Sequence, residues 1–479
     1  MRRVLATRFD VEHARGAAIC AAVKSFIQHL RDLRWGVLAL AASGCVPPGP
    51  DAPRSFHVAD GFIRDPEGRA VILRGANVSG RHKEPPYFDF HGPADFARMR
   101  TEWGMNSVRY LVSWAALEPE QDAYDEAYLE ELHRRVKEAT DAGLLVFLDL
   151  HQDLYGVGFL GGNGMPRWTC DASRYAAYVP REPWFMNYTN PEMTACYDGF
   201  WTSRALQEKY VAAWARIAER FRDVPGVIGF DPMNEPYWGS IPPDVLESTR
   251  LANLYRSIIA AVRVHRPDWI AFLEPAASRN LGFRTHLPVF TEPNIVYAPH
   301  SYDANAESGQ GFDPARRAAI LEAVASLRAE ADALGAALVI GEYGGMASHP
   351  GIYDYMDAEF AAAGVARAGA MYWTYTRSER YGLLDLEGNP KPALLAAVAR
   401  PYPERVAGTP GAWTMDGDTF EFTYTPDTAL TATTRIALPA GTWSVQCEGG
   451  RATLRDGGVE LVAHGEGDVH VRLKAASTP

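Results

Sequence analysis

Between Phe56 and about Pro401, short apolar runs alternate with helical patterns along the chain. The apolar residues in these runs are continuous rather than alternating with polar ones, which is typical of parallel strands buried on both faces. Eight strands are predicted, at Val71–Val78, Ser107–Trp114, Leu144–His151, Val227–Asn234, Trp269–Glu274, Ile295–His300, Ala337–Glu342 and Gly369–Thr374.

The clearest helical pattern lies between the second and third predicted strands. Apolar residues recur there at spacings of three and four, namely Tyr128, Leu129, Leu132, Val136 and Ala139. Asp125 is a suitable N-cap, and Gly143 follows the end of the pattern. Residues 204–221 and 253–265 are similar. Eight strand–helix units predict an α/β fold, a (β/α)8 TIM barrel over residues 56–401.

The tail has a different pattern. Apolar residues alternate with polar ones at Phe420, Phe422 and Tyr424, and again in residues 469–473, with glycines between the runs. This alternation predicts a small C-terminal antiparallel β-sandwich over residues 410–476, after a proline-rich stretch that ends the barrel.

Composition narrows the classes of function. The formal net charge is −12, so the chain lacks the basic balance of a nucleic-acid-binding protein. The sequence contains no Cys-x-x-Cys pair, no His-x-x-x-His helix and no phosphate-binding glycine loop. We therefore expect neither a metal nor a cofactor.

The first 45 residues resemble an export signal. Arg31 and Arg34 precede an apolar run at 35–42, and small residues then lead to Cys45. Such a run is too short to span a bilayer but suits the core of a signal peptide. We expect residues 1–45 to be a signal or lipoprotein-type leader lipidated at Cys45, and 46–55 to be a linker. The protein would then be exported by a bacterium, as a secreted or membrane-anchored protein. The alternatives are secretion without a lipid and a tail without a signal.

Charged and polar residues stand at or just after the carboxyl ends of several predicted strands. They are Arg109, His151, Asp153, Asn234, Glu235, His300, Tyr302, Glu342 and Trp373. In a barrel these strand ends meet at the face that carries active sites. A retaining glycosidase needs two carboxyl groups there, about 5–5.5 Å apart, one as nucleophile and one as acid/base. Glu235 and Glu342 end the fourth and seventh strands, which face each other across the barrel mouth.

At these motifs the sequence resembles glycoside hydrolase family 5 of clan A, across residues 56–401. The resemblance implies that Glu235 is the acid/base and Glu342 the nucleophile. It also implies that Asn234 binds the sugar 2-hydroxyl, Arg109 lies beside the nucleophile, His151 and His300 line the glycone subsite, Tyr302 hydrogen-bonds Glu342 and Trp373 stacks under the sugar. A nearby guanidinium is expected to lower the pKa of the nucleophile. The structural alternatives are a core ion pair for Arg109, a structural imidazole for either histidine and simple packing for Trp373.

A narrower resemblance is to endoglycoceramidases. It rests on Arg74-Gly75-Ala76-Asn77-Val78, on residues 83–87, 148–153, 162–168 and 199–201, and on the sandwich after the barrel. It implies that Lys83, Asp153 and Trp168 contact the reducing-end sugar and help to bind glycolipid. For Lys83 the alternative is a solvated loop lysine.

A long insertion after the third strand, residues 152–201, carries seven aromatic residues from Trp168 to Tyr197. We expect them to present an apolar surface to a lipid aglycone at a membrane, although they could instead form a small core that supports the loop. Cys170 and Cys196 in this insertion could pair if the protein is exported, or remain free thiols. The predicted function is retaining hydrolysis of the bond between glycan and lipid. The alternatives are an endo-β-glucanase or mannanase of the same family and a non-catalytic glycan-binding lipoprotein.

Overall fold

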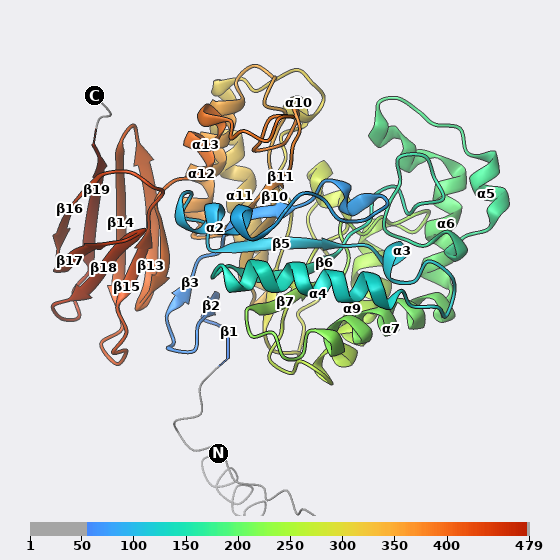
Figure 1. Cartoon of the computed structure of the whole chain (residues 1–479), viewed down its shortest axis with the longest axis horizontal. Helices are drawn as coiled ribbons and strands as arrows, with labels where there is room; N and C mark the ends of the chain where they lie inside the picture. The colour runs from blue at the N-terminus through green and yellow to red at the C-terminus, as the bar shows by residue number, and fades with distance from the viewer. Residues whose placement is uncertain (1–54, 477–479) are drawn as a thin grey trace, which may run out of the picture. The chain divides into compact units, whose positions relative to one another are not determined.

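The computed structural model describes residues 55–476. Cys45, the predicted leader 1–45 and most of the predicted linker lie outside these residues. Eight parallel strands close into a barrel (Figure 1), in agreement with the eight predicted strands. They are β4 (Arg74–Val78), β5 (Ser107–Val112), β6 (Leu145–Leu150), β7 (Val227–Asp231), β8 (Ile270–Leu273), β9 (Ile295–Tyr297), β10 (Ala337–Tyr343) and β11 (Gly369–Tyr375).

Helices surround the barrel. The longer ones are α2 (Pro93–Thr101), α4 (Glu126–Asp141), α6 (Pro191–Thr202), α7 (Arg204–Arg220), α9 (Ala252–Arg263), α11 (Arg317–Leu334), α12 (Ile352–Ala366) and α13 (Pro392–Val398). The Asp125 side chain accepts the N–H of Tyr128 at 2.9 Å, so the predicted cap of α4 is confirmed. Among residues 55–476, no helix is both long and apolar enough to cross a bilayer.

Short helical turns lie in the connections. They are η2 (Arg81–Lys83), α3 (Trp114–Leu117), η3 (Arg167–Thr169), α5 (Ala172–Ala177), η4 (Trp184–Thr189), α8 (Pro243–Val245), η5 (Leu246–Leu251), η6 (Ala277–Leu281), α10 (Ala304–Glu307) and η7 (Pro314–Arg316). Most of them follow the carboxyl end of a barrel strand, so they shape the face where the polar residues gather.

The barrel interior is packed. Phe147 and Phe272 stack at 4.1 Å between ring centres and belong to one buried cluster with Val339 and Met371. Ile63 belongs to the same cluster. Since Phe147, Phe272, Val339 and Met371 come from strands around the barrel, the cluster fills its interior and leaves the strand ends free for function.

The C-terminal region forms two antiparallel sheets. One has the order β13-β14-β19-β16, and the other ends in β12-β15-β18-β17. The strands are β12 (Tyr402–Val406), β13 (Gly408–Asp416), β14 (Thr419–Pro426), β15 (Thr434–Ala437), β16 (Trp443–Glu448), β17 (Gly450–Arg455), β18 (Gly458–Ala463) and β19 (Val469–Ala475). Phe420, Phe422 and Tyr424 are buried, as their alternation predicts.

The boundaries differ from the predicted ones at both ends of the barrel. Residues 57–71, which the sequence pattern places in the barrel, form β1 (His57–Ala59), β2 (Phe62–Arg64) and β3 (Ala70–Val71). These strands extend the second sheet, because β3 pairs with β12. The proline-rich stretch is also not a simple linker, because it contains β12 and the start of β13. Prolines at sheet positions without a ladder N–H are compatible with a strand.

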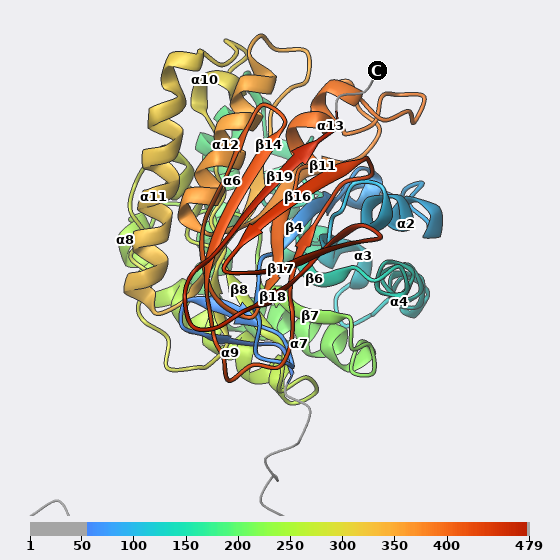
Figure 2. The same ribbon diagram turned by 90° about the vertical axis from the view of Figure 1, so that its left-hand side faces the viewer.

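The sandwich packs against the barrel through α12 (Figure 2). A Cβ at Gly364 of α12 would lie 2.3 Å from the carbonyl oxygen of Trp413. Glycine therefore allows the helix to approach β13 closely. Trp413 is fully buried in the sandwich core, together with Phe360 of α12.

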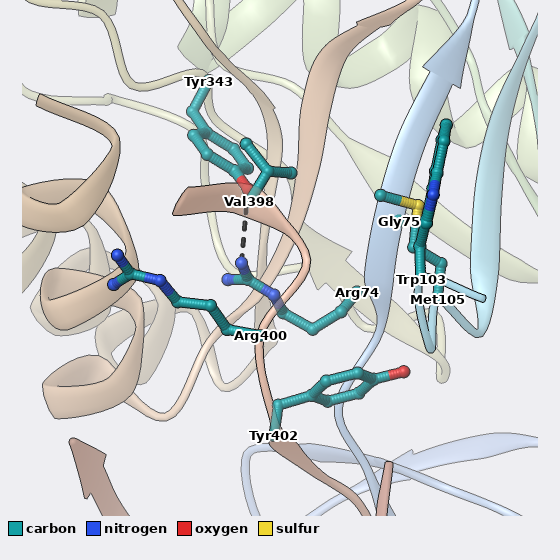
Figure 3. Close-up of a pocket in the computed structure, with 8 residues that line it drawn as sticks. All are labelled: Arg74, Gly75, Trp103, Met105, Tyr343, Val398, Arg400 and Tyr402. Atoms are coloured by element: carbon teal, nitrogen blue, oxygen red, sulfur yellow. Dashed lines mark hydrogen bonds between the residues drawn. The ribbon is translucent and has the colours of Figure 1, made fainter. Parts of the chain in front are cut away.

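A small cavity lies near this junction, lined by residues that include Arg74, Tyr343 and Tyr402 (Figure 3). Arg74 donates to the Tyr343 hydroxyl at 3.3 Å. The cavity has a volume of about 10 Å³, which accommodates about one water molecule. It is too small to be a substrate site.

Candidate active site

Arg109 in β5 is the centre of the polar network at the strand ends. Its guanidinium lies 3.1 Å from Asp149, 2.9 Å from Asp231, 2.8 Å from Glu274 and 2.7 Å from Glu342. These carboxylates come from β6, β7, the residue after β8, and β10. Arg109 is fully buried. It is thus both a core ion pair and a neighbour of the predicted nucleophile.

Burial and charge distribute the protons in this network. Burial and the neighbouring Glu274 raise the pKa of Asp231 well above its ordinary value. Burial also opposes ionisation of Glu274, but the charges of His300 and Arg109 outweigh it and lower the pKa of Glu274 to about 2. Burial by itself would lower the pKa of Arg109. The four surrounding carboxylates raise it by more than burial lowers it, so the pKa of Arg109 lies well above its ordinary value.

The two predicted glutamates face each other. Glu235 follows β7 with a φ of 40°, a left-handed conformation that is uncommon outside glycine and frequent at functional sites. Glu342 lies in β10. A carboxylate oxygen of Glu235, a ring nitrogen of His300 and a carboxylate oxygen of Glu342 all lie within 4.8 Å of one another. This spacing fits the close pair of a retaining glycosidase and is shorter than the separation of about 6.5–9.5 Å in inverting enzymes.

Glu342 is fixed from two sides. The Tyr302 hydroxyl donates to Oε2 at 2.8 Å, and Arg109 Nη1 donates to Oε1 at 2.7 Å. The expectation that the guanidinium lowers the pKa of Glu342 is only half correct. Burial raises this pKa more than His300 and Arg109 lower it, so the pKa of Glu342 is raised from its ordinary value.

Glu235 accepts two hydrogen bonds on Oε1, from His300 Nδ1 at 2.8 Å and from Asn280 Nδ2 at 2.7 Å. The other ring nitrogen of His300 lies 3.1 Å from Glu274 Oε1. Burial lowers the pKa of His300, but Glu274, Glu342 and the bond to Glu235 together raise it well above the ordinary value. Although His300 is close enough to hold a metal ion with the two glutamates, a protonated imidazole has no lone pair for a metal.

A second group of residues lies beside the glutamates. The ring of Trp373 in β11 stacks on that of His151 at 5.5 Å between centres, with 13° between planes. Lys83 Nζ lies 4.4 Å from the centre of the Trp373 ring and 2.6 Å from Asp153 Oδ2. His151 also bonds Asp153 and the buried Asp149, at 3.2 Å and 2.7 Å. Lys83 is therefore a member of this group rather than a solvated loop lysine.

Asn234 is held rigidly between the two groups. Its carbonyl oxygen accepts from Arg109 Nη2 at 2.9 Å, and its amide donates to the backbone oxygen of Gln152 at 3.0 Å. Trp168 is different, because its contacts are a bond to the backbone oxygen of Glu118 and edge-to-face packing on Trp114. The structure brings together the predicted residues of the barrel face apart from Trp168.

The aromatic insertion fits both interpretations in part. Five of the seven rings from Trp168 to Tyr197 pack inward, namely Trp168, Tyr175, Tyr178, Tyr188 and Tyr197. Trp184 and Phe185 are exposed, with 52% and 46% of their surface accessible. Cys170 and Cys196 form a disulfide with their Cα atoms 5.5 Å apart. The insertion is thus a small core that displays a few apolar side chains at its surface.

Several members of the site were not predicted. Glu274 ends the fifth predicted strand, so its position gave the same signal as that of Glu342. Asp149 and Asp231 lie within apolar runs, where a lone carboxylate is itself a signal of a partner. Asn280 lies in η6, where no sequence pattern distinguishes it.

Comparisons with known proteins agree with this geometry. Residues 65–379 match the family model described as Cellulase (glycosyl hydrolase family 5), and residues 400–474 match the glycoside hydrolase family 5 C-terminal domain. The chain belongs to glycosyl hydrolase family 5. It is a retaining glycoside hydrolase with a two-glutamate site.

Two relatives span most of the chain. Endoglycoceramidase I of Rhodococcus hoagii is 30% identical over 454 residues, which cover 87% of this chain and 86% of the relative. The structure of endo-glycoceramidase II from a Rhodococcus species in complex with ganglioside GM3 has a TM-score of 0.78 and 29% identity, and covers 87% of this chain and 99% of that one. A glucosylceramidase of Cryptococcus neoformans is 30% identical, but over only 37% of this chain and 32% of its own length.

Proposed function

We propose that the protein hydrolyses the β-glycosidic bond between the glycan and the lipid aglycone of a glycosphingolipid or a similar glycolipid. The observation that carries this proposal is the close pair of Glu235 and Glu342. Hydroxyl-binding groups gather around Trp373, and exposed apolar side chains follow Asn280, which contacts Glu235. The names of two relatives that span most of the chain support the same substrate class.

In this proposal Glu342 attacks the anomeric carbon and forms a glycosyl-enzyme. Glu235 protonates the oxygen that leaves with the lipid, and then takes a proton from the water that hydrolyses the intermediate. The bonds from Tyr302 and Arg109 support this role, since they hold the Glu342 carboxylate in one orientation. Precise orientation of a nucleophile is a large part of catalysis.

The sugar would lie over Trp373. An aromatic face suits the C–H face of a sugar ring, while Lys83, His151 and Asp153 can bond its hydroxyls. Asn234 is placed between Arg109 and Gln152 so that its amide stays fixed. We propose that Asn234 contacts the 2-hydroxyl, beside the anomeric carbon.

The lipid would lie on the side of Glu235. Tyr237 and Trp238 follow Glu235 in the chain, and Tyr237 packs on Tyr188 of the insertion at 4.8 Å between ring centres. Leu281 and Phe283 follow Asn280 and are 68% and 61% exposed. Apolar side chains exposed beside the leaving-group position suit an alkyl chain, because each buried methylene contributes about 0.8 kcal/mol.

The test compares two leaving groups on one sugar. We expect kcat/KM to be at least about tenfold higher for a long-chain β-glycoside than for the matching methyl glycoside, a difference of about 1.4 kcal/mol. Equal values, or a clear preference for cellulose or mannan oligomers over a fluorescent glycosphingolipid, would contradict the proposal.

We further propose that the protein is exported and contacts membranes peripherally through Trp184, Phe185 and the adjacent Met186. These side chains are exposed together in η4, and aromatic residues favour the membrane interface. Sedimentation with glycolipid-containing vesicles tests the contact, and mass spectrometry of protein from a Gram-negative host tests lipidation at Cys45. An intact Met1 on the exported protein rules out the leader.

A further inference from the structure

A second pocket opens on the same face of the barrel as the glutamates. Its volume is about 460 Å³, within the range of about 300–1,000 Å³ typical of ligand pockets. Its wall contains Pro85, Tyr87, Phe88, Pro119, Asp125 and Tyr128. These residues belong to the connections after β4 and β5 and to the first turn of α4, so they lie at the carboxyl ends of the strands.

The chain links this pocket directly to the residues beside Trp373. Pro85 is two residues after Lys83, whose Nζ contacts both Asp153 and the Trp373 ring. Two residues of extended chain span at most about 7 Å. The pocket therefore begins next to the polar end of the site, the end where hydroxyl-binding groups gather.

The chemistry of the wall suits a sugar. Tyr128 stacks with Phe88 at 5.1 Å between ring centres and meets Tyr87 edge-on at 6.3 Å. The stacked pair forms the floor of the pocket, while the half-buried Tyr87 and the exposed Pro85 and Pro86 offer apolar surface to the C–H face of a sugar. Asp125 is exposed and caps α4 with Oδ1, so its other carboxylate oxygen can accept from a sugar hydroxyl. An exposed carboxylate disfavours an anionic ligand, so a neutral sugar fits better than an acidic one.

An alkyl chain would be bound elsewhere. The leaving group must lie at Glu235, whose carboxylate accepts from Asn280. Tyr237 and Trp238 follow Glu235 in the chain, and the exposed Leu281 and Phe283 follow Asn280. The lining of the pocket begins two residues after Lys83, whose Nζ contacts the Trp373 ring at the polar end of the site. A glycan that extends from the cleaved bond over Trp373 continues toward the pocket.

We propose that this pocket binds a neutral sugar of the glycan beyond the two nearest the cleaved bond. The inference rests on the proposed function and adds that the enzyme favours glycolipids whose glycan has three or more sugars. The wall residues bind and orient this distal sugar and take no part in bond cleavage.

The test fills the pocket without touching the glutamates. Ala127 is exposed in the wall, at the start of α4, so Ala127→Trp fills the space, whereas Ala123→Trp adds the same side chain at an exposed position outside it. The substrates are the 4-methylumbelliferyl β-glycosides of lactose, of lactose extended by a neutral hexose, and of lactose extended by sialic acid.

We expect the wild type to cleave the neutral trisaccharide with a kcat/KM about tenfold above that of the lactoside, and to show a smaller gain with the sialylated one. We expect Ala127→Trp to abolish the gain and to keep lactoside turnover within about twofold of the wild-type value. Ala123→Trp should keep the gain. If Ala127→Trp does not fold, Tyr87→Asn is the second variant. Asparagine tolerates the φ of 66° at this position, and loss of the Tyr87 ring is expected to lower the gain. The inference is overturned if the wild type shows no gain, if the sialylated glycan gains more, or if the filled or ring-deleted pocket keeps the gain. Failure of the proposed function is distinct, because it appears as equal kcat/KM for long-chain and methyl β-glycosides of one sugar, whereas this test varies the glycan on one leaving group.

Discussion

At the scale of single residues, the charges around Arg109 decide which groups hold protons. Five carboxyl groups lie around Arg109 and His300, and His151 pairs with one of them, Asp149. One consequence is the raised pKa of Asp231, which relieves the excess of negative charge. Another is the raised pKa of His300, which places a cation between Glu235 and Glu274. The ionisation of Glu342 thus depends on a neighbouring imidazolium.

The first prediction concerns this dependence. A nucleophile must be ionised, so kcat/KM falls on the acid side as Glu342 gains a proton, and its raised pKa places this limb above the usual range of a glutamate. His300→Asn removes a nearby positive charge and raises the pKa of Glu342 further. We expect the acid limb of kcat/KM to move up by about 1 to 3 pH units.

The control is His470→Asn, at an exposed position of β19. It should leave the profile unchanged. If the acid limb of kcat/KM stays in place in His300→Asn, or moves to lower pH, the imidazolium does not control the ionisation of Glu342.

His300 and Glu342 both make the fold less stable as pH rises, because each binds its proton more tightly in the folded state than in the unfolded state. The folded state raises the pKa of His300 above its unfolded value, so its contribution is fully present below about pH 6.5 and is lost as pH rises through the folded pKa. Glu342 also has a raised folded pKa, so its carboxyl group favours the folded state when protonated and opposes it when ionised. Part of the stability is thus given up to keep the nucleophile buried and charged.

At the scale of elements, the insertion after β6 combines a small core with an exposed apolar surface. The disulfide joins the end of η3 to α6, and Tyr188 and Tyr197 pack on Tyr237 behind Glu235. The rings therefore connect the folding of the insertion to the side where the lipid is expected.

The second prediction concerns this disulfide. Replacing both Cys170 and Cys196 by serine releases a loop closure worth about 3 kcal/mol. We expect faster proteolysis and hydrogen exchange within residues 171–195 and a lower kcat/KM for the long-chain glycoside. Turnover of a short chromogenic β-glycoside should stay within about twofold. Cys447→Ser, in β16, is the control. Equal losses on both substrates would contradict a role of the insertion on the lipid side.

Elements with a strong period were predictable from the sequence, and those that depend on partners distant in the chain were not. The eight barrel strands are apolar runs, and Phe420, Phe422 and Tyr424 reveal β14 by alternation. In contrast, β1–β3 are only two or three residues long and join β12 across more than 300 positions of the chain, so no local pattern specifies their sheet.

The residues of the active site also divide into those that the sequence predicts and those that only the fold reveals. Glu235 and Glu342 follow from strand ends and family motifs. The role of Asp231 follows only from the convergence of strands on Arg109, and that of Asn280 only from the path of η6. Trp168 has the expected residue type in the expected motif, yet it packs on Trp114 instead.

At the scale of the whole described unit, the barrel and the sandwich share structural elements. Strands from the N-terminal end complete a sheet of the sandwich, and α12 of the barrel packs under Trp413. Two regions joined in this way should unfold together.

The third prediction tests this coupling. Trp413→Ala removes a fully buried ring and is expected to lower the free energy of unfolding by about 3–5 kcal/mol. Loss of activity and loss of β-sheet signal should occur at the same urea concentration, lower than in the wild type. Trp443→Ala, at a half-buried position of β16, should have a smaller effect. Two separate transitions would show that the barrel is stable without the sandwich.

The most direct measurement of the proposed chemistry is to trap the glycosyl-enzyme. A 2-deoxy-2-fluoro β-glycoside slows hydrolysis of the intermediate, and peptide mapping then locates the attached sugar. We expect it on Glu342. Glu342→Ala should form no adduct and should lose turnover by several orders of magnitude, and added azide should partly restore it with a glycosyl azide of inverted configuration. An adduct on another residue, or wild-type activity of Glu342→Ala, would contradict the assignment of Glu342 as the nucleophile.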